Sequence, residues 1–414
     1  MGHHDLNWRN LVGEGTAGKT ILVFSKIPIA PAFGGNRQRI LTMLDELRHR
    51  HRVDFVLIPS RQMRDIDLDA HRAFFGDGHF HVMTRGKVAE LRFTARILLR
   101  RLKARIFGKR LSTDVDALFD RSLEKQCRGL IKTIAPDVVL VEYVHFSKIF
   151  EWVPVGTRKL LDTHDSFSHE FTAEAERKGL ARADALLAIQ EREARLFRDM
   201  LGAESGTEIA MVSHIIADQP MIGAPSCEGA SFLGSKFEAN NLSLAALVEN
   251  VMPLVLAQRP DFKLHVIGNV GESVPDQPFI VKHGRVEVVA QALVHAPVLA
   301  NYIVKGSGIK IKMLDAMGMG IPYVSTPLGA DGVPADFAHG GVVAQDDQAF
   351  ADALVALYDD SGKRAAMGKA GLECAGRWNA AQRRALHAVV TGFDPLHDGG
   401  SVTTTAHHRQ VKAA

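Results

Sequence analysis

The segment "KGSGIKIKMLDAMGMGIPYVSTPLGADG", residues 305–332, reads as a glycine loop, a short helix and a new strand. The loop at 306–308 leads into a helix that carries Lys310, Lys312 and Asp315, and further glycines and a proline end it. The loop, the helix dipole and the lysines favour an anion, while the carboxylate can accept hydrogen bonds from sugar hydroxyls. We therefore expect a site for an anionic ligand here. The alternative is a surface ion pair between Lys312 and Asp315, which share a helix face.

Strand-like and helix-like segments alternate on both sides of this segment, which is typical of parallel α/β architecture. A stretch rich in Pro and Gly, 218–229, is the best linker candidate. The predicted strands are 20–25, 52–58, 79–83, 137–142, 158–162, 209–213, 231–235, 263–267, 278–282, 297–303 and 321–326. The predicted organisation is a lead-in (1–19), an N-terminal domain (20–217), the linker (218–229), a C-terminal domain (230–375), a helix that can pack back on the N-terminal domain (376–393) and a flexible tail (394–414).

Composition indicates a soluble protein of 414 residues, with 46% hydrophobic and 23% charged residues. No apolar run is seen that reaches the ~18–20 residues needed to span a bilayer, and the N-terminus lacks the plan of a secretory signal. The three cysteines are far apart, so neither a disulfide framework nor a thiolate metal site is expected. These features favour the cytoplasm. Residues 1–170 hold 28 basic against 20 acidic side chains, so any anionic surface is expected to meet the first half.

An early motif, "GEGTAGKT" at 13–20, matches the phosphate-binding pattern of nucleotide hydrolases. That mechanism requires a strand before the loop and a helix after it. Here the apolar run "ILVFS" follows the loop and predicts a strand instead. We interpret the match as a chance one, with Lys19 exposed and dispensable.

Two further loops follow predicted strands, where ligands bind in open parallel sheets. Gly34 and Gly35 open a helix after the first strand, which allows close approach of a diphosphate or sugar, although for the pair taken alone a simple turn is the favoured interpretation. Asp162, His164 and Asp165 crowd the end of strand 158–162. A histidine beside a carboxylate suits proton handling or hydroxyl recognition, and a helix cap is the alternative.

With these stretches in view, the chain resembles a glycosyltransferase of the GT-B class, close to the retaining group 1 / family 4 glycosyl transferases. The resemblance covers most of residues 20–375 and includes "FGGNRQR", "PDVVLVEYVHF", "LLDTHDSFSHE" and "ALLAIQEREARLF". It continues with "SFLGSKFEANNLSLAALVENVMPLVLAQRPDFKLHVIGNVG" and the glycine-lysine helix. It implies two Rossmann-like domains that face a central cleft, with a nucleoside-diphosphate sugar held mainly by the second.

The resemblance also implies roles for individual residues. Asp315 would bind the ribose, and His164, with Asp165 beside it, would act at the donor sugar. Gly34 and Gly35 would let the first domain close on the phosphates. The diphosphate would contact the lysines and glycines of the second domain, namely Lys236, Lys310, Lys312 and Gly308, and Gly234 and Gly268 would line the cleft, with 282–286 near the base.

Two departures from the family pattern are visible. The family has two glutamates eight positions apart, whereas this chain has Ser307 and Asp315. The arginine usual after "FLG" is also absent, which leaves Lys236 as the nearest cation. The implied activity is transfer of a hexose-type sugar, with retention as the family's expectation, to a hydroxyl of a glycan or lipid-linked glycan in polysaccharide or envelope synthesis. A nucleotide-sugar 2-epimerase and a degenerate nucleotide-sugar-binding partner subunit are the alternatives.

Metal use is not expected. Two Asp-x-Asp pairs, Asp67/Asp69 and Asp114/Asp116, do not directly follow apolar strands, and the second resembles a helix cap with an acidic first turn. Lysines and a helix dipole can neutralise a leaving diphosphate, so we expect no metal and no cofactor besides the donor substrate.

A basic amphipathic helix is predicted over 85–110, with ten Lys/Arg and one acidic residue. Leu91, Ala95, Leu98, Leu99, Leu102 and Ile106 form one stripe, and Arg92, Arg96, Arg100 and Lys103 form the adjoining face. Such a helix can lie on anionic lipid, or it can pack on the core with a basic outer face. Nucleic acid is not expected, because aromatic residues for base stacking are scarce. The hypothesis is a peripheral enzyme on the cytoplasmic membrane face.

Overall fold

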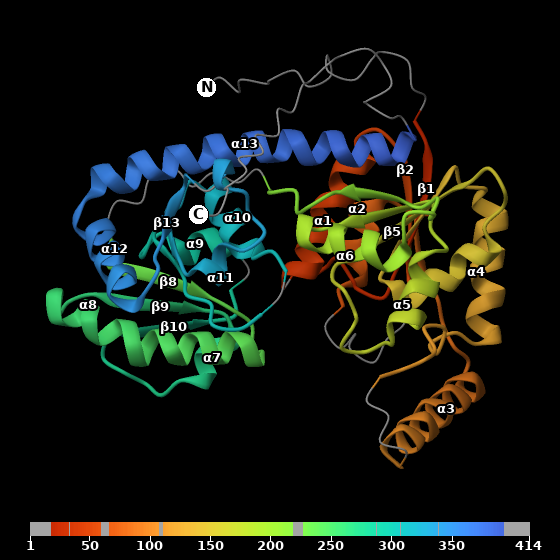
Figure 1. The fold of residues 1–414 in the computed structure, drawn as a ribbon, viewed down its shortest axis with the longest axis horizontal. Coiled ribbons are helices and arrows are strands. Elements are labelled where there is room, and N and C mark those ends of the chain that lie inside the picture. Colours follow the sequence, from red (N-terminus) through yellow and green to blue (C-terminus); the bar gives the residue numbers. More distant parts are fainter. Residues whose placement is uncertain are drawn as a thin grey trace, which may run out of the picture.

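The computed structural model describes residues 18–32, 34–58, 66–106, 111–217, 227–286, 288–306, 308–337 and 339–392. Two parallel sheets, each flanked by helices, form two domains that lie side by side in Figure 1. The α/β class and the two Rossmann-like domains predicted from the sequence are confirmed.

The first sheet has seven strands in the order β3-β2-β1-β4-β5-β6-β7. Every printed pairing in it is parallel, so all strands end at one edge. The strands are β1 (Thr20–Ser25), β2 (Arg52–Leu57), β3 (Phe80–Val82), β4 (Val138–Glu142), β5 (Arg158–Asp162), β6 (Ala185–Ala188) and β7 (Glu208–Met211). β6 was not predicted, because its "ALLA" is too short and alanine-rich to read as a strand.

Helices cover both faces of this sheet, and apolar side chains form a core on each side. Ile40, Leu44 and Leu47 lie fully buried on one face of the helix after β1, as the periodicity predicts. The helices are α1 (Gly35–Arg48), α2 (Leu68–Phe75), α3 (Lys87–Ile106), α4 (Arg121–Ile134), η2 (Val144–Trp152), α5 (Ala173–Leu180) and α6 (Glu191–Leu201).

The second sheet has six parallel strands in the order β10-β9-β8-β11-β12-β13. They are β8 (Gly229–Leu233), β9 (Lys263–Ile267), β10 (Ile280–Gly284), β11 (Leu299–Asn301), β12 (Tyr323–Ser325) and β13 (Gly341–Val343). β13 was also missed, since a three-residue strand that begins with glycine carries little pattern. Around the sheet lie α7 (Glu238–Ala246), η3 (Leu247–Val251), α8 (Met252–Gln258), η4 (Asn269–Ser273), α9 (Val289–Leu293), α10 (Ile311–Gly318), α11 (Pro327–Ala330), η5 (Ala335–Phe337) and α12 (Asp347–Asp359).

The run Glu238–Gln258, which comprises α7, η3 and α8, corrects the expectation that no segment is long and apolar enough to span a bilayer. An 18-residue window within its 21 residues has a mean hydropathy of 1.2, enough by length and composition alone to cross a membrane. Leu244, Leu247, Val251 and Met252 lie in the core of the second domain, so this run packs as a core helix on its sheet.

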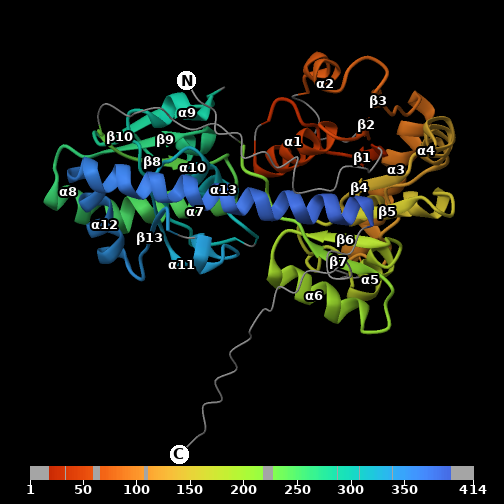
Figure 2. The same ribbon diagram turned by 90° about the horizontal axis from the view of Figure 1, so that it is seen from above.

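The last helix, α13 (Ser361–Thr391), runs along both domains (Figures 1 and 2). Near its middle, Cys374 and Trp378 lie in a core formed mainly by the second domain, and near its end Leu386 and Val389 lie in a core of the first. His387 Nε2 also lies 2.8 Å from Glu46 Oε1 on α1. One continuous helix therefore stands where a separate helix was predicted from residue 376, and it joins the domains.

Two local interpretations can be checked against the fold. β1 begins at Thr20, directly after Lys19, so the described end of the "GEGTAGKT" motif leads into a strand, as expected; residues 13–17 lie outside the described part. The Asp114/Asp116 pair is not a helix cap: Asp114 Oδ1 accepts a hydrogen bond from the Asp116 amide within a turn. Asp67 of the other pair does cap α2.

Candidate active site

The carboxyl edges of the two sheets face each other where the domains meet. Gly35, at the start of α1, lies so close to α10 that a β-carbon on it would be 3.1 Å from Ile311 Cδ1. Gln190, after β6, contacts Gly332 of the second domain, and Arg192 Nη1 lies 3.9 Å from Asp331 Oδ2. Ligand-binding loops of both sheets thus converge, as expected for open parallel sheets.

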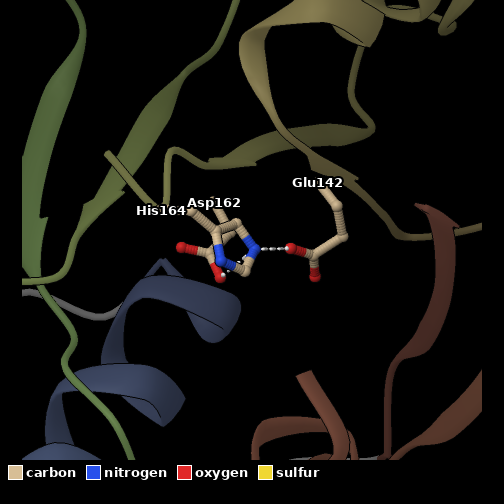
Figure 3. Close-up of side chains that lie close together, drawn as sticks. All are labelled: Glu142, Asp162 and His164. Atoms are coloured by element: carbon tan, nitrogen blue, oxygen red, sulfur yellow. Dashed lines mark hydrogen bonds and ion pairs between the residues drawn. The ribbon is translucent and has the colours of Figure 1, made fainter. Parts of the chain in front are cut away.

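His164 is the centre of a buried polar cluster on the first domain, shown in Figure 3. Its Nε2 lies 2.5 Å from Glu142 Oε2 and 3.4 Å from Asp162 Oδ2. Glu142 ends β4 and Asp162 ends β5, and these two residues pair in register, so parallel strands place both carboxylates at one edge. The carboxylates beside His164 are thus Glu142 and Asp162, and Asp162 is one of the two expected at this strand end.

Arg39 on α1 balances the charge of this cluster. Its Nε and Nη2 donate to both oxygens of Asp162, at 3.0 and 2.7 Å, inside the protein. Burial alone would raise the pKa of Asp162, but the Arg39 guanidinium holds it below its usual range. Burial and the Asp162 charge raise the pKa of Glu142 to about 7, although its bond to His164 opposes this. The Glu142 carboxyl can therefore hold or release a proton near neutral pH.

The three side chains Glu142, Asp162 and His164 could by distance hold a metal ion, since their ligand atoms lie within 4.8 Å of one another. Arg39 already occupies both oxygens of Asp162, however, and its fixed positive charge disfavours a cation beside it. The chemistry of this donor set is better suited to orienting a histidine than to binding a metal.

The His164 ring is fixed by stacking and by its backbone. It lies parallel to the Tyr143 ring, with centroids 4.2 Å apart. Lys26 Nζ lies 4.7 Å from the centroid of the Tyr143 ring. Both His164 (φ 59) and Tyr143 (φ 71) have left-handed backbones, which are uncommon for such residues. Strained, stacked residues at the ends of adjacent strands are typical of a functional site.

Asp165 faces a different group of charges. It hydrogen-bonds Glu193 of α6 and lies close enough to Lys310 of the second domain to influence its pKa. Burial, with the nearby Asp165 carboxylate, raises the pKa of Glu193 to about 8. The acidic group formed by Asp165 and Glu193 on the first domain therefore lies near Lys310 of the second domain.

The glycines of the second domain lie at the carboxyl edge of its sheet. Gly268 (φ 101) follows β9, and a β-carbon on it would collide with the backbone oxygen of Gly234, so no side chain fits. The Gly268 amide donates to Gly284 O of β10 at 2.6 Å. Lys236 is exposed nearby, and its Nζ lies 2.8 Å from Glu272 Oε2. These backbones form a side-chain-free rim at the carboxyl edge.

The three charged residues predicted for the nucleotide lie at the start of α10 and on it. Lys310 precedes the helix and donates from Nζ to Gly308 O at 2.5 Å. Lys312 is half-buried as a residue, but its ammonium points inward, donating to Leu233 O at 3.0 Å. Burial and Lys310 lower the pKa of Lys312 to about 8.

Asp315 is not engaged by Lys312, so the ion pair considered as the alternative is not formed. Its Oδ1 instead lies 2.8 Å from Nε2 of His214, a buried residue after β7. The other side of His214 is held by α13, since Trp378 Nε1 donates to His214 O at 2.8 Å.

Several members of the site were missed from the sequence. Arg39 shares a helix face with the apolar Met43 and Leu47, a spacing that would have marked it as buried. Glu142 closes an apolar strand, which is the same signal that singled out Asp162. His214 carries no local signal.

Some expected residues cannot be placed. Ser307 lies outside the described residues, as do the side chains of Arg100 and Lys103 on α3. Arg92 and Arg96 are exposed on that helix.

Solved structures with the same arrangement are numerous, and all those named here are less than 25% identical, so they show the fold alone. The structure of TarM has a TM-score of 0.66 and 12% identity, covering 90% of this chain and 98% of that one. Sucrose-phosphate synthase from Thermosynechococcus elongatus has a TM-score of 0.59 and 14% identity over 90% and 99%. HepE from Anabaena, solved with UDP and glucose, has a TM-score of 0.60 and 11% identity over 91% and 100%.

The two facing Rossmann-like domains, with their loops converging from both carboxyl edges, define this protein as a member of the GT-B fold class. Residues 230–360, most of the second domain, match the family described as "Glycosyl transferases group 1". The resemblance inferred from the sequence is thereby confirmed.

One curated relative comes from Klebsiella pneumoniae and is described as "Uncharacterized 44.6 kDa protein in cps region". It is 28% identical over 137 residues, which are 30% of this chain and 35% of the relative. The match therefore spans about a third of that protein's length.

Proposed function

We propose that this protein is a glycosyltransferase that moves a hexose-type sugar from a nucleoside-diphosphate sugar to a hydroxyl of a glycan or lipid-linked glycan. The observation that carries the proposal is the juxtaposition at the domain junction. Asp315 meets the first domain at His214, and Lys310, before α10, lies near Asp165. Asp165 immediately follows His164, whose ring is held by Glu142 and Asp162. One edge suits a nucleotide and its phosphates, and the other suits a reacting sugar.

The donor contacts follow from these positions. Asp315 accepts from the ribose hydroxyls, Lys310, Lys312 and Lys236 neutralise the diphosphate, and the bare backbone at Gly34, Gly234 and Gly268 admits close approach. Lys236 must leave Glu272 to do so. Neutralisation by lysines and by the α10 N-terminus favours a metal-independent reaction, and the family favours retention.

The comparisons support this proposal in two ways. The family match covers the whole donor side, from β8 to α12. HepE was solved with UDP and glucose, and the Staphylococcus aureus TarM structure contains UDP and an α-GlcNAc-glycerol, so this fold holds such ligands in other proteins. The Klebsiella relative lies in a cps region, which favours a role in polysaccharide synthesis.

The test is a panel of UDP-, GDP- and ADP-hexoses, incubated with and without glycan acceptors, with release of nucleoside diphosphate as the readout. We expect acceptor-dependent release from one donor class in EDTA, and much less with Asp315→Ala. Conversion of the donor without acceptor would instead identify an epimerase. Nucleotide binding without either reaction would identify a non-catalytic partner subunit.

We further propose that α3 places the enzyme on an anionic membrane, where a lipid-linked acceptor would be reached. The apolar stripe of α3 faces solvent: Val88, Leu91 and Leu98 are 64%, 71% and 66% exposed. This observation contradicts the alternative of a helix packed on the core by that stripe. In Figure 1, α3 stands apart from the sheet of the first domain.

The charge of α3 favours an anionic membrane over a second copy of the protein as the partner of its exposed apolar stripe. The sequence of α3 contains seven Lys/Arg and one acidic residue, Glu90. Arg92 flanks the exposed leucines, so apolar side chains can enter a bilayer while its guanidinium meets lipid phosphates. Arg96 instead ties α3 to the first domain, since its Nη2 donates to Phe119 O at 2.6 Å. A second copy of α3 would bring like charges together, which disfavours a dimer through this helix. A cytoplasmic, peripheral location follows from this proposal.

A further inference from the structure

Lys26 is a half-buried cation beside the His164 cluster, and the proposed donor contacts do not use it. It follows β1 directly, and β1 pairs in parallel with β4, so Lys26 and the residue after β4, Tyr143, lie at the same carboxyl edge. The Ser25 hydroxyl accepts a hydrogen bond from the Ile27 amide and donates to Ile27 O, both at 2.9 Å. Ser25 and Ile27 are buried, so the backbone on both sides of Lys26 is fixed.

The Lys26 ammonium lies close to the residues proposed to act at the donor sugar. Its Nζ is 4.7 Å from the centroid of the Tyr143 ring, and the His164 ring stacks on the same tyrosine with centroids 4.2 Å apart. The Tyr143 hydroxyl accepts a hydrogen bond from Asn36 Nδ2, at the start of α1, at 3.4 Å. One aromatic ring therefore contacts both the cation and the central histidine of the cluster.

The positive charge of Lys26 has no direct partner among the described residues: Nζ makes no hydrogen bond there, and no carboxylate lies at ion-pair distance. Glu170 acts on it through space, and Glu170 Oε2 is itself held by His145 Nε2 at 3.0 Å. Burial lowers the pKa of Lys26, and the charge of Glu170 opposes this. An ammonium has three donors, and an aromatic face supplies a carboxylate or phosphate oxygen to none of them. This is a site prepared for an anion.

The donor diphosphate is not the anion that these positions favour. Lys236, Lys310 and Lys312 belong to the second domain, where the N-terminus of α10 also favours negative charge. Lys26 belongs to the first domain and lies one ring away from His164. It therefore meets a group that lies beside the donor sugar, which is the place of the acceptor.

From these contacts we propose that Lys26 binds an anionic group of the acceptor, so that the enzyme acts on acidic saccharides in preference to neutral ones. The inference rests on the proposed transfer function and adds the class of its acceptor. The anion is a carboxylate of an acidic sugar or a phosphate of a glycosyl phosphate, since both accept charge-assisted hydrogen bonds from an ammonium. A neutral acceptor would displace water from Lys26 without replacing it by a charged partner. The exposed Glu170 can accept from sugar hydroxyls with the oxygen that His145 does not hold.

The test measures binding of three probes to the full chain by calorimetry: an oligosaccharide that contains a hexuronate, its carboxyl-reduced neutral form, and a hexose 1-phosphate. We expect the wild type to bind at least one anionic probe about 10–100-fold more tightly than the neutral form. Lys26→Met, which keeps the length of the side chain but not its charge, should lose this preference. The uronate and the phosphate probes distinguish the two sources of negative charge.

A matched lysine serves as the control. Lys132 is exposed on α4, and α4 ends shortly before β4 begins, so this lysine lies near the opposite edge of the sheet. Lys132→Met should bind all three probes like the wild type. The Kd for a nucleoside diphosphate should be the same in the wild type and in both variants.

Three results would overturn the inference: no preference for an anionic probe in the wild type, the same preference in Lys26→Met, or a weaker affinity of Lys26→Met for nucleoside diphosphate. The last result would assign Lys26 to the donor. Failure of the proposed transfer function is a separate outcome. Binding of an anionic probe that depends on Lys26, without transfer from any nucleotide-sugar, would support the anion site and reject the transferase. Transfer with equal rates for anionic and neutral acceptors would retain the transferase and reject this inference.

Discussion

Asp315 on α10 is held by His214, a residue that belongs to the end of the first domain: His214 Nε2 lies 2.8 Å from Asp315 Oδ1. His214 is fully buried, and α13 fixes its backbone through Trp378. Only one oxygen of Asp315 is used in this bond, so the other is free to accept a ribose hydroxyl. The proposed nucleotide carboxylate is therefore oriented by the other domain.

Replacing His214 should weaken nucleotide binding although this residue need not touch the nucleotide. We expect His214→Ala to raise the Kd for the nucleoside diphosphate by about 10–100-fold, because a hydrogen bond to a charged group contributes about 1.5–3 kcal/mol. His214→Gln, whose amide can take the place of Nε2, should restore most of the affinity. Calorimetric titration measures both. Normal binding by His214→Ala with unchanged circular dichroism would show that Asp315 needs no such support.

Lys312 should strengthen donor binding but lower the free energy of unfolding near neutral pH. Its folded pKa of about 8 lies below the ordinary 10.5, so between these values the unfolded chain binds more protons and the wild-type free energy of unfolding rises with pH. Lys312→Met lacks this rise and should be more stable at pH 7, by on the order of 1 kcal/mol. It should also bind the donor at least about 10-fold more weakly. Denaturant unfolding at pH 7 and 10 and donor titration check the two effects.

The pH dependence of stability expected from Glu193 has the opposite sign. Its folded pKa of about 8 lies above the ordinary 4.5, so the folded protein binds more protons in this window and stability falls as pH rises through it. The slope from this group is at most about 1.4 kcal/mol per pH unit. Glu193→Gln should flatten the decline between pH 5 and 8, whereas the exposed Glu204→Gln should leave it unchanged. Parallel declines in both variants would contradict the assignment.

The fold could be predicted from the sequence because apolar strands and intervening helices alternate in both halves. Residue partners could not be predicted in the same way. His164 was singled out, but its partner Glu142 is 22 residues earlier and comes to it only because β4 and β5 are neighbours in the sheet. His214 and Asp315 are 101 residues apart and meet through the arrangement of whole domains. Local pattern carries no information on either contact.

α3 shows a second limit of what local sequence pattern can predict. The spacing of Leu91, Leu98 and Leu99 correctly predicts one apolar stripe, but periodicity does not say whether the stripe faces a core or solvent. Only packing decides this, and here the rest of the first domain fills its two cores without those leucines.

Replacing Glu142 should lower the turnover rate and leave the affinity for the donor nearly unchanged. Glu142→Gln keeps a hydrogen-bonding group beside His164 but cannot exchange a proton with it, so we expect kcat to fall by about 10–100-fold with little change in the donor KM. His164→Ala should lose at least as much. A rise in KM at constant kcat in Glu142→Gln would show that the cluster only binds the donor. Steady-state rates over a range of donor concentrations distinguish these outcomes.

Membrane binding should depend jointly on the leucines and the arginines of α3. We expect the wild type to pellet with vesicles of phosphatidylcholine and phosphatidylglycerol at low salt, but not with phosphatidylcholine alone, since each basic residue near an anionic surface contributes about 1 kcal/mol. Leu98→Ser/Leu99→Ser should remove the apolar part of binding, and Arg92→Gln should weaken its dependence on anionic lipid. These three side chains are exposed, so the variants should fold and release nucleoside diphosphate from the donor at the wild-type rate with a soluble acceptor. Wild-type protein that stays in the supernatant with anionic vesicles, or that dimerises through α3 in solution, would contradict a membrane role for this helix.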